Sequence, residues 1–293
     1  MTAQIIDGKQ IANQIKQEIA LEVTKIKEKT GKVPTLAVIL VGEDPASHVY
    51  VRNKERAAEK AMIKSLAFRF GEDISENDLI AKIEELNADD EVNGILVQLP
   101  LPAHIDSRKV IYAIDPDKDV DGFNIVNVGK LSVGDVEGDS AAIVPCTPLG
   151  CVYLAKTVLG EDLSGLKALV IGTSNIVGRP LARLLMLEGC TVTIANRSTK
   201  DLAAEVRQAD IVIPATGVVN LIKKDMVKKG AVVIDVGINR VSDENGVDFL
   251  VGDVDFEAVK EVAKAITPVP GGVGPMTIAY LLKNTLKCFN KMN

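Results

Sequence analysis

Along the chain, stretches in which apolar residues recur every three or four positions alternate with short, continuous apolar runs. From residue 10 to 29, isoleucine and valine follow the helical spacing among Lys and Glu, which predicts an amphipathic helix. LAVILVG (36–42) is a continuous run of the kind found in strands that are buried on both faces. A second helical pattern covers 46–62. The pattern therefore predicts a helix, a strand and a helix in succession.

The alternation continues along the next part of the chain. SLAFRF (65–70) predicts a second strand, and VNGILVQLPLP (92–102) predicts a third, which its prolines end. Between them, Ser75 and Asp78 have the spacing of a capping box that opens a helix through Asn87. Strands that alternate with helices are typical of a parallel sheet with helices on its faces. We therefore expect an N-terminal three-layer α/β domain.

A second series of strands and helices fills the C-terminal half. Four apolar runs predict its strands: KALVIG (167–172), TVTIAN (191–196), DIVIPATG (210–217) and AVVIDVG (231–237). Between Asp115 and Val144 the pattern breaks up into Gly, Asp and Asn, so we expect a linker there. The predicted domains are residues 1–122 and 145–270. A terminal helix over 277–293 is expected to return to the first domain.

Composition is consistent with two globular domains and argues against several classes of function. The chain has 293 residues, which is long for a single hydrophobic core. Its 34 basic and 40 acidic residues leave a net charge of −6, which gives no general attraction to nucleic acid or anionic membrane. Aromatic residues make up 3% and Trp is missing, which argues against a stacking platform for single-stranded nucleic acid.

Cysteine and histidine usage predicts neither a disulfide framework nor a metal site. The cysteines have no C-x-x-C spacing, and the histidines are too few for the usual zinc sites. These residues are Cys146, Cys151, Cys190, Cys288, His48 and His104. The N-terminus does not resemble a signal peptide, and no apolar stretch approaches about 18 residues. We expect a cytoplasmic protein whose reduced cysteines fill core space, without metal, membrane or nucleic acid.

A glycine turn follows the first strand of the second series. Gly172-Thr-Ser-Asn-Ile-Val-Gly178 stands between KALVIG and a helical pattern. Backbone N–H groups in such a turn and the positive end of the helix dipole suit a pyrophosphate. The usual dinucleotide motif is G-x-G-x-x-G, and here Ser174 occupies the position of the second glycine. A turn without a ligand is the alternative, because many doubly wound sheets contain one.

The end of the next strand favours NADP over NAD. An NAD site usually has an acidic residue about 20 positions after the turn, to bind the ribose 2′-hydroxyl. This chain reads Ala195-Asn-Arg197-Ser198 there, with no carboxylate. The guanidinium and the hydroxyl would suit a 2′-phosphate through charge-assisted hydrogen bonds. A surface arginine at a strand end, which is common, is the alternative interpretation.

Candidate catalytic side chains lie in the first half of the chain. Ser47, Tyr50 and Lys54 are spaced three and four apart, so they share one face of the predicted helix. A phenol one turn from an ammonium suits acid–base work on a heteroaromatic substrate, although a solvated helix face has the same pattern. Gln98 and Asp121 stand at a strand end and in a loop, where α/β sheets bind ligands and where turn residues are also common.

Together these motifs resemble a single family. In chain order they are SHVYVRNKE, GILVQLPLP, DKDVDGF, PCTPLG, GTSNIVGRP and PVPGGVGPMT. From about Ile6 to the last helix, the sequence closely resembles the bifunctional methylenetetrahydrofolate dehydrogenase/cyclohydrolase (FolD) family of folate one-carbon metabolism. The resemblance implies a folate-binding catalytic domain followed by a Rossmann-like NADP-binding domain. It also implies oxidation of 5,10-methylenetetrahydrofolate with NADP⁺ and hydrolysis of the 5,10-methenyl product to 10-formyltetrahydrofolate.

The resemblance further implies roles for the candidate catalytic residues. Lys54 matches the catalytic lysine of the family, which chiefly serves the cyclohydrolase step, and Gln98 matches the partner that positions it. Tyr50 matches the tyrosine that stacks on the folate. Asp121 matches the carboxylate that anchors the donor edge of the pterin.

Cofactor and substrate-loop residues follow from the same resemblance. The cofactor matches are Gly172, Thr173 and Ser174 in the phosphate loop, Arg197 at the 2′-phosphate and Ile238 beside the cofactor. The matches in the substrate loop are Pro270, Gly271 and Gly272. Glycines in that loop would let the backbone approach the substrate closely.

One departure from the family keeps two alternatives open. Thr173 stands where many members carry an Arg that helps to hold the 2′-phosphate, so a monofunctional NAD-dependent methylenetetrahydrofolate dehydrogenase is one alternative. A non-catalytic NADP-binding protein on the same fold is the other. Tyr50, Lys54 and Gln98 favour the bifunctional enzyme over both. The resemblance also implies a homodimer.

Overall fold

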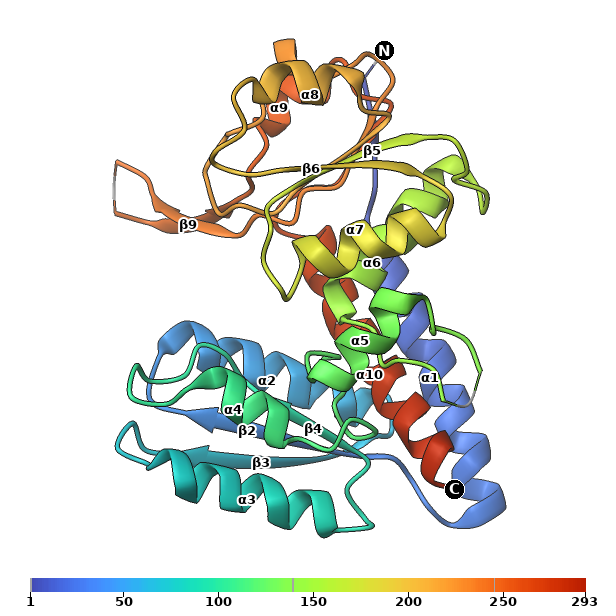
Figure 1. Ribbon diagram of the computed structural model, residues 1–293, viewed down its shortest axis with the longest axis vertical. Helices are drawn as coiled ribbons and strands as arrows, with labels where there is room; N and C mark the ends of the chain where they lie inside the picture. The colour runs from blue at the N-terminus through green and yellow to red at the C-terminus, as the bar shows by residue number, and fades with distance from the viewer. Residues whose placement is uncertain (1, 139, 245) are drawn as a thin grey trace. The chain divides into compact units, whose positions relative to one another are not determined.

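The chain forms two compact α/β units (Figure 1). The structure is a computed structural model that describes residues 2–138, 140–244 and 246–293. The N-terminal unit consists of Asn13–Cys146 and Ile278–Asn293. The C-terminal unit consists of the residues up to Ala12 and Thr147–Thr277. The prediction of two α/β domains is confirmed.

In the N-terminal unit, the sheet has the strand order β3-β2-β4, and neighbouring strands are parallel. Its strands are β2 (Thr35–Val41), β3 (Lys64–Phe70) and β4 (Gly94–Val97). Every residue of β2 is buried, because this strand lies between two others and is covered on both faces. The continuous apolar run at 36–42 therefore marks the central strand.

Helices cover both faces of this sheet (Figure 1). The helices of this unit are α2 (Pro45–Lys60), α3 (Glu76–Ala88), α4 (Ser107–Ala113) and α5 (Ile125–Val133), together with most of α1 (Gly8–Thr30) and α10 (Val273–Met292). Ala37, Ile39 and Val41 point to one face, where they pack with apolar residues of α3 and α4. α2 connects β2 to β3 across the other face. The expected three-layer domain is confirmed. Ser75 caps α3 as predicted, since its Oγ accepts the N–H of Asp78 at 3.1 Å.

The segment 115–144 is part of the N-terminal unit and not a linker. It contains α5, which Asn124 caps by accepting the N–H of Val126 at 2.9 Å. The helix ends at Gly134, whose φ of 90° is the left-handed conformation that glycine adopts readily. Residues 141–144 are buried. The Gly, Asp and Asn residues that suggested a linker serve here as helix caps and in turns.

The last helix completes the N-terminal unit, as expected. Residues 278–293 of α10 belong to it. The buried side chain of Asn284 donates to the carbonyl oxygens of Val120 and Val144, each at 2.9 Å. These bonds bind the end of the chain to the loop that carries Asp121.

The C-terminal unit contains a parallel sheet in the order β1-β11-β8-β7-β5-β6. Its strands are β1 (Gln4–Ile5), β5 (Lys167–Ile171), β6 (Thr191–Ala195), β7 (Ile211–Pro214), β8 (Val232–Val233) and β11 (Ala265–Ile266). Counted along the chain from β5, the order is 2-1-3-4-5, one of the doubly wound arrangements. β1 pairs with β11, so the first residues extend this sheet, although the sequence analysis placed them in the first domain.

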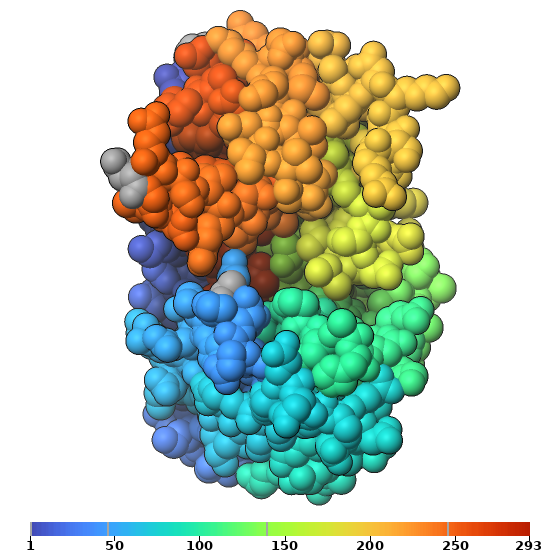
Figure 2. Space-filling view, turned by 90° about the vertical axis from the view of Figure 1, so that its left-hand side faces the viewer, coloured from blue at the N-terminus to red at the C-terminus, as the bar shows by residue number. Residues whose placement is uncertain are grey.

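Short helices and a hairpin complete the C-terminal unit. The helices are α6 (Cys146–Leu159), α7 (Gly178–Leu187), α8 (Leu202–Gln208), α9 (Phe256–Val259) and the 3₁₀ turn η1 (Lys224–Met226). The antiparallel strands β9 (Asn239–Ser242) and β10 (Asp248–Val251) form a separate hairpin. Figure 2 shows this region in orange on the surface of the unit. Nothing in the apolar pattern predicts the hairpin.

Within the described residues, no helix is both long and apolar enough to cross a membrane. The same residues contain no group of three or more His, Cys, Asp and Glu that could hold a metal ion. Four free cysteines are buried, namely Cys146, Cys151, Cys190 and Cys288. Burial raises the pKa of each of these thiols, so they are poor nucleophiles.

Candidate functional site

In the N-terminal unit, α2 presents an aromatic ring and an ammonium group from one face. Asp44 caps the helix by accepting the N–H of Ser47 at 2.8 Å, and Pro45 opens its first turn. Tyr50 and Lys54 then follow one turn apart. Tyr50 is 39% exposed and Lys54 is half-buried. The start of the helix thus determines which face carries these two side chains.

Lys54 contacts the residue that follows β4. Its Nζ donates to Oε1 of Gln98 at 3.0 Å, across 44 positions of the chain. Gln98 is held at two further points, since its backbone N–H donates to the carbonyl oxygen of Ile39 at 2.8 Å and its Nε2 to that of Leu99 at 2.6 Å. Because the amide is fixed in this way, its oxygen stays directed at Lys54. The structure therefore brings these two candidate residues together.

Asp121 is a half-buried carboxylate near the same lysine. Burial raises the pKa of Asp121, whereas the positive charge of Lys54 lowers it. Within the described residues, the carboxylate of Asp121 forms no hydrogen bond or ion pair with the protein. The buried carboxylate of Asp119, two residues earlier, accepts three hydrogen bonds. Asp121 is thus an unused acceptor, suited to a ligand with N–H donors.

In the C-terminal unit, β5 and α7 meet in the tight glycine turn that the sequence predicts. Gly172 has a φ of 125°, and a Cβ on it would lie 2.4 Å from the carbonyl oxygen of Ala215, after β7. A Cβ on Gly178 would lie 2.0 Å from the carbonyl oxygen of Gly172. Both positions therefore require glycine. The loops after β5 and β7 lie against each other where the strand order reverses, which is where doubly wound sheets bind ligands.

Ser174 closes this turn with its side chain. Its Oγ accepts the N–H of Val177 at 3.1 Å and that of Gly178 at 3.3 Å, so it caps the N-terminus of α7. Thr173 is exposed beside it. The serine in place of the second glycine of the motif thus supplies a hydroxyl at the helix N-terminus.

The turn after β6 presents Arg197. The Oδ1 of Asn196 accepts the N–H of Ser198 at 2.8 Å, and the Oγ1 of Thr199 accepts the N–H of Asn196 at 2.9 Å. These bonds fix the backbone of the turn. In the part of the chain that the structure describes, the exposed guanidinium of Arg197 has no hydrogen-bond or ion-pair partner. It is therefore free to bind a phosphate.

Comparison with known proteins matches each unit to a domain of one protein family. The family model for the tetrahydrofolate dehydrogenase/cyclohydrolase catalytic domain matches residues 6–121, and the model for the NAD(P)-binding domain of the same family matches residues 145–293. The chain belongs to the tetrahydrofolate dehydrogenase/cyclohydrolase family. This finding confirms the family resemblance and the domain types expected from the sequence.

Individual members of the family match this chain over nearly its whole length. Bifunctional protein FolD 3 of Rhizorhabdus wittichii is 57% identical over 285 residues, which cover 97% of this chain and 92% of the relative. The FolD methylenetetrahydrofolate dehydrogenase/cyclohydrolase structure from Campylobacter jejuni is 50% identical with a TM-score of 0.92, covering 98% and 99% of the two chains. The Trypanosoma brucei FolD structure, complexed with NADP cofactor and inhibitor, is 38% identical with a TM-score of 0.93. The match covers 99% of this chain and 98% of the T. brucei chain.

This member of the tetrahydrofolate dehydrogenase/cyclohydrolase family also has a buried carboxylate pair that the sequence analysis missed. One oxygen of Asp253 accepts the N–H and the Oγ1–H of Thr216, at 2.6 and 2.8 Å, and the N–H of Gly217 at 3.1 Å. Asp235 accepts the N–H of Gly237 at 2.9 Å and that of Asp253 at 3.0 Å. Burial raises the pKa of Asp235 to about 6. The pair joins the loops that follow β7 and β8.

The sequence contains one local feature that could have indicated this pair of aspartates. Asp235 stands in DVG and Asp253 in GDV, so each has a glycine close by. A Cβ on Gly237 would lie 2.2 Å from Oδ1 of Asp253, and one on Gly252 would lie 1.8 Å from Oδ2 of Asp235. Ile238 follows directly and is 45% exposed. The carboxylate pair therefore holds the loop that presents this candidate cofactor residue.

The candidate substrate loop packs against the start of α1 in the C-terminal unit. The backbone N–H of Lys9 donates to the carbonyl oxygen of Gly271 at 2.9 Å, and Gly271 has a φ of 108°. A Cβ on Gly8 would lie 1.9 Å from the carbonyl oxygen of Gly272. These contacts fix the backbone after Pro270. The four candidate catalytic residues belong to the other unit.

Proposed function

We propose that this protein oxidises 5,10-methylenetetrahydrofolate with NADP⁺ and then hydrolyses the 5,10-methenyl product to 10-formyltetrahydrofolate. The observation that carries the proposal is the hydrogen bond from Lys54 to Gln98 near the unpaired carboxylate of Asp121. Membership of the family and 57% identity to a bifunctional relative support the same pair of activities.

In the first step, a hydride leaves the methylene carbon and the one-carbon group becomes the methenyl cation. NADP⁺, when bound, accepts the hydride, and the protein orients the reactants. The glycine turn fits a pyrophosphate, because Gly172 and Gly178 allow the backbone to pack tightly between β5 and the N-terminus of α7, where free N–H groups can bind a phosphate. The Ser174 hydroxyl accepts bonds at the helix N-terminus and can still donate its hydrogen to a phosphate oxygen. We also assign Thr173 and the exposed Ile238 to cofactor contacts.

In the second step, water adds to the methenyl carbon and one proton is released. The bond from that carbon to N5 then breaks as the hydroxyl proton moves to N5, which leaves the formyl group on N10. We assign the proton transfers to Nζ of Lys54, which its hydrogen bond to Gln98 holds in place. Gln98 acts as the positioning residue for this lysine.

Folate recognition uses the other residues of the site. We assign Asp121 to the amino-pyrimidine edge of the pterin, because a free carboxylate can accept two parallel N–H bonds. We assign Tyr50 to stacking on the folate, since its ring is 39% exposed one turn from Lys54. Pro270, Gly271 and Gly272 are proposed to contact the folate through their backbone.

Arg197 supports NADP over NAD as the cofactor. Its unpaired guanidinium follows β6, where an NAD site usually carries a carboxylate. The crystal structure of a relative from Trypanosoma brucei contains bound NADP cofactor together with an inhibitor. Arg197 compensates in this proposal for Thr173, which stands where many members carry Arg.

We propose a homodimer that uses the hairpin of β9 and β10. Three apolar side chains near or on β10 are exposed, with Val247 at 60%, Phe249 at 48% and Leu250 at 36%. A second copy of the chain would remove this apolar surface from water. Light scattering coupled to gel filtration should give the mass of a dimer for the wild type and a lower mass for Phe249→Ser.

The experiment that tests the function is a set of paired initial rates with 5,10-methylenetetrahydrofolate and either NADP⁺ or NAD⁺, with the methenyl intermediate followed by its absorbance. Turnover with NADP⁺ and rapid loss of added methenyl compound are expected. Turnover with NAD⁺ and persistent methenyl compound would instead identify a monofunctional NAD-dependent dehydrogenase. Folate binding without turnover with either cofactor would identify a non-catalytic protein.

A further inference from the structure

Asp119 closes the turn that carries Asp121. It is 1% exposed. Its Oδ1 accepts the N–H of Gly122 at 3.1 Å, and its Oδ2 accepts the N–H of Asn124 at 2.7 Å and Nδ2 of Asn127 at 3.1 Å. Two of these donors are backbone groups just after Asp121. The carboxylate of Asp119 therefore determines the path of the backbone at Asp121.

The same turn has little freedom to adjust. Gly122 has a φ of 70°, and a Cβ there would lie 2.4 Å from the carbonyl oxygen of Ile143. On the other side, the carbonyl oxygen of Val120 accepts Nδ2 of Asn284 at 2.9 Å. The backbone on either side of Asp121 is therefore held by buried contacts.

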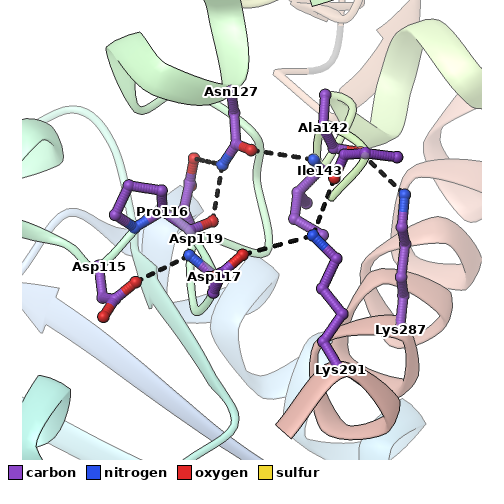
Figure 3. Close-up of polar contacts among 10 residues, drawn as sticks. Asp115, Pro116, Asp117, Asp119, Asn127, Ala142, Ile143, Lys287 and Lys291 are labelled. Carbon is purple, nitrogen blue, oxygen red and sulfur yellow. Dashed lines mark hydrogen bonds and ion pairs between the residues drawn. The ribbon is translucent and has the colours of Figure 1, made fainter. Parts of the chain in front are cut away.

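Asn127 links Asp119 to a second layer of contacts (Figure 3). Its Nδ2 also donates to the carbonyl oxygen of Pro116 at 2.8 Å, and its Oδ1 accepts the N–H of Ile143 at 3.0 Å. The two residues before Ile143 are also held in place, because two lysines of α10 donate to their carbonyl oxygens. These bonds are Lys287 Nζ to Ala142 at 2.9 Å and Lys291 Nζ to Ala141 at 2.8 Å.

We propose that Asp119 is a positioning residue for folate binding, which acts by holding the carboxylate of Asp121 at the place where the pterin binds. This inference rests on the proposed function, because it takes Asp121 as the pterin contact. The two residues have different environments. Asp119 accepts hydrogen bonds from three donors of the protein and so holds the backbone at Asp121, whereas the oxygens of Asp121 have no such donor among the described residues. Rigid placement of such an acceptor raises affinity because less ordering is needed on binding.

The test is Asp119→Asn, which keeps the shape but replaces one acceptor oxygen with an N–H₂ group facing N–H donors. The KM for methylenetetrahydrofolate and the KM for methenyltetrahydrofolate should each rise about tenfold, because buried donors are left unpaired. The KM for NADP⁺ should change by less than about twofold, because no cofactor residue is touched. The matched control is Asp117→Asn, which makes the same change at a side chain that is 62% exposed and whose only partner among the described residues is Lys291. It should keep both folate KM values.

The split between KM and kcat separates positioning from stability alone. A variant that is merely destabilised has fewer active molecules, so kcat and the unfolding temperature fall while KM is unchanged. That result for Asp119→Asn would overturn the proposal. If Asp119→Asn does not fold, Asn127→Ala removes only one of the three donors. Its folate KM values should rise about threefold, and unchanged values would again reject the positioning role.

Asp121→Asn distinguishes this inference from the proposed function. A higher folate KM in Asp121→Asn with a normal one in Asp119→Asn rejects the positioning role and leaves the pterin contact standing. A normal folate KM in Asp121→Asn rejects the pterin contact itself, and the positioning role with it. A raised folate KM in both Asp121→Asn and Asp119→Asn supports the pterin contact of Asp121 and the positioning role of Asp119.

Discussion

Lys54 and Lys60 belong to the same helix but differ in their surroundings. Lys54 is half-buried and donates to Gln98, whereas Lys60 is exposed. We expect Lys54→Ala to lower the cyclohydrolase rate by about 100-fold or more, because the assigned proton donor and acceptor is lost. The decay of methenyltetrahydrofolate absorbance measures this rate, and Lys60→Ala should leave it unchanged. A normal rate in Lys54→Ala would remove the role assigned to this lysine.

A second single-residue substitution, at Arg197, tests the choice between NADP⁺ and NAD⁺. We expect Arg197→Ala to raise the KM for NADP⁺ about tenfold, because a charge-assisted bond to the 2′-phosphate is lost. The KM for NAD⁺ should change little, since NAD⁺ lacks that phosphate. Dehydrogenase rates with each cofactor measure both values, and Lys200→Ala, a nearby exposed cation, is the control. Equal changes for NADP⁺ and NAD⁺ would reject the phosphate contact.

Among the elements, the junction of β5 and α7 depends on the absence of a Cβ. In Gly178→Ala the new carbon would lie 2.0 Å from the carbonyl oxygen of Gly172, so the helix must shift away from the turn. We expect a KM for NADP⁺ at least about tenfold higher and a loss of stability of about 1–3 kcal/mol. Gly129→Ala in α5 is the control, because a Cβ there meets nothing within 4 Å. Equal behaviour of the two variants in thermal unfolding would contradict this prediction.

The loops after β7 and β8 should respond to pH through Asp235. Burial raises the pKa of Asp235 from its ordinary 3.8 to about 6, and Asp253 adds to the effect. Below pH 4 both the folded and the unfolded chain carry this proton, and between about pH 4 and 6 only the folded chain retains it. Its contribution to stability therefore falls as pH rises through that window.

Asp235→Asn removes this titration. From pH 4 to 7, the free energy of unfolding of the wild type should fall relative to Asp235→Asn by about 3 kcal/mol, the equivalent of roughly two pKa units. Urea unfolding at several pH values measures the difference. Asp225→Asn, at an exposed aspartate, should show no such trend. A difference between wild type and Asp235→Asn that does not depend on pH would contradict the raised pKa.

At the scale of the whole molecule, the residues assigned to the two reactions lie in different units of the chain. Lys54 belongs to the N-terminal unit and Gly178 to the C-terminal unit. We expect Lys54→Ala to retain hydride transfer and Gly178→Ala to retain hydrolysis. At an NADP⁺ concentration well below the raised KM of Gly178→Ala, a mixture of the two variants should therefore form 10-formyltetrahydrofolate from methylenetetrahydrofolate after a lag, while each alone forms little. A mixture no better than its components would show that Lys54 also serves hydride transfer.

The main elements, and the places of the candidate residues on them, were predictable because their signals are local. The buried run before Gly42, the helical spacing of Tyr50 and Lys54, and the strand–turn–helix at Gly172 each lie within a few residues of sequence. Periodicity and turn chemistry act over that range, so the pattern determines two α/β domains and the position of the glycine turn. The family resemblance added roles to these positions.

Contacts between distant positions were decided only by the tertiary structure. The two-residue strand β1 depends on its pairing with β11, and Asp235 meets Asp253 across 18 positions. The segment 115–144 looked like a linker because its polar residues have no period, yet Asp119 and Asn127 bury their side chains by bonding to one another and to the backbone. Burial of a polar side chain depends on which partners the fold brings to it, and that information is absent from local spacing.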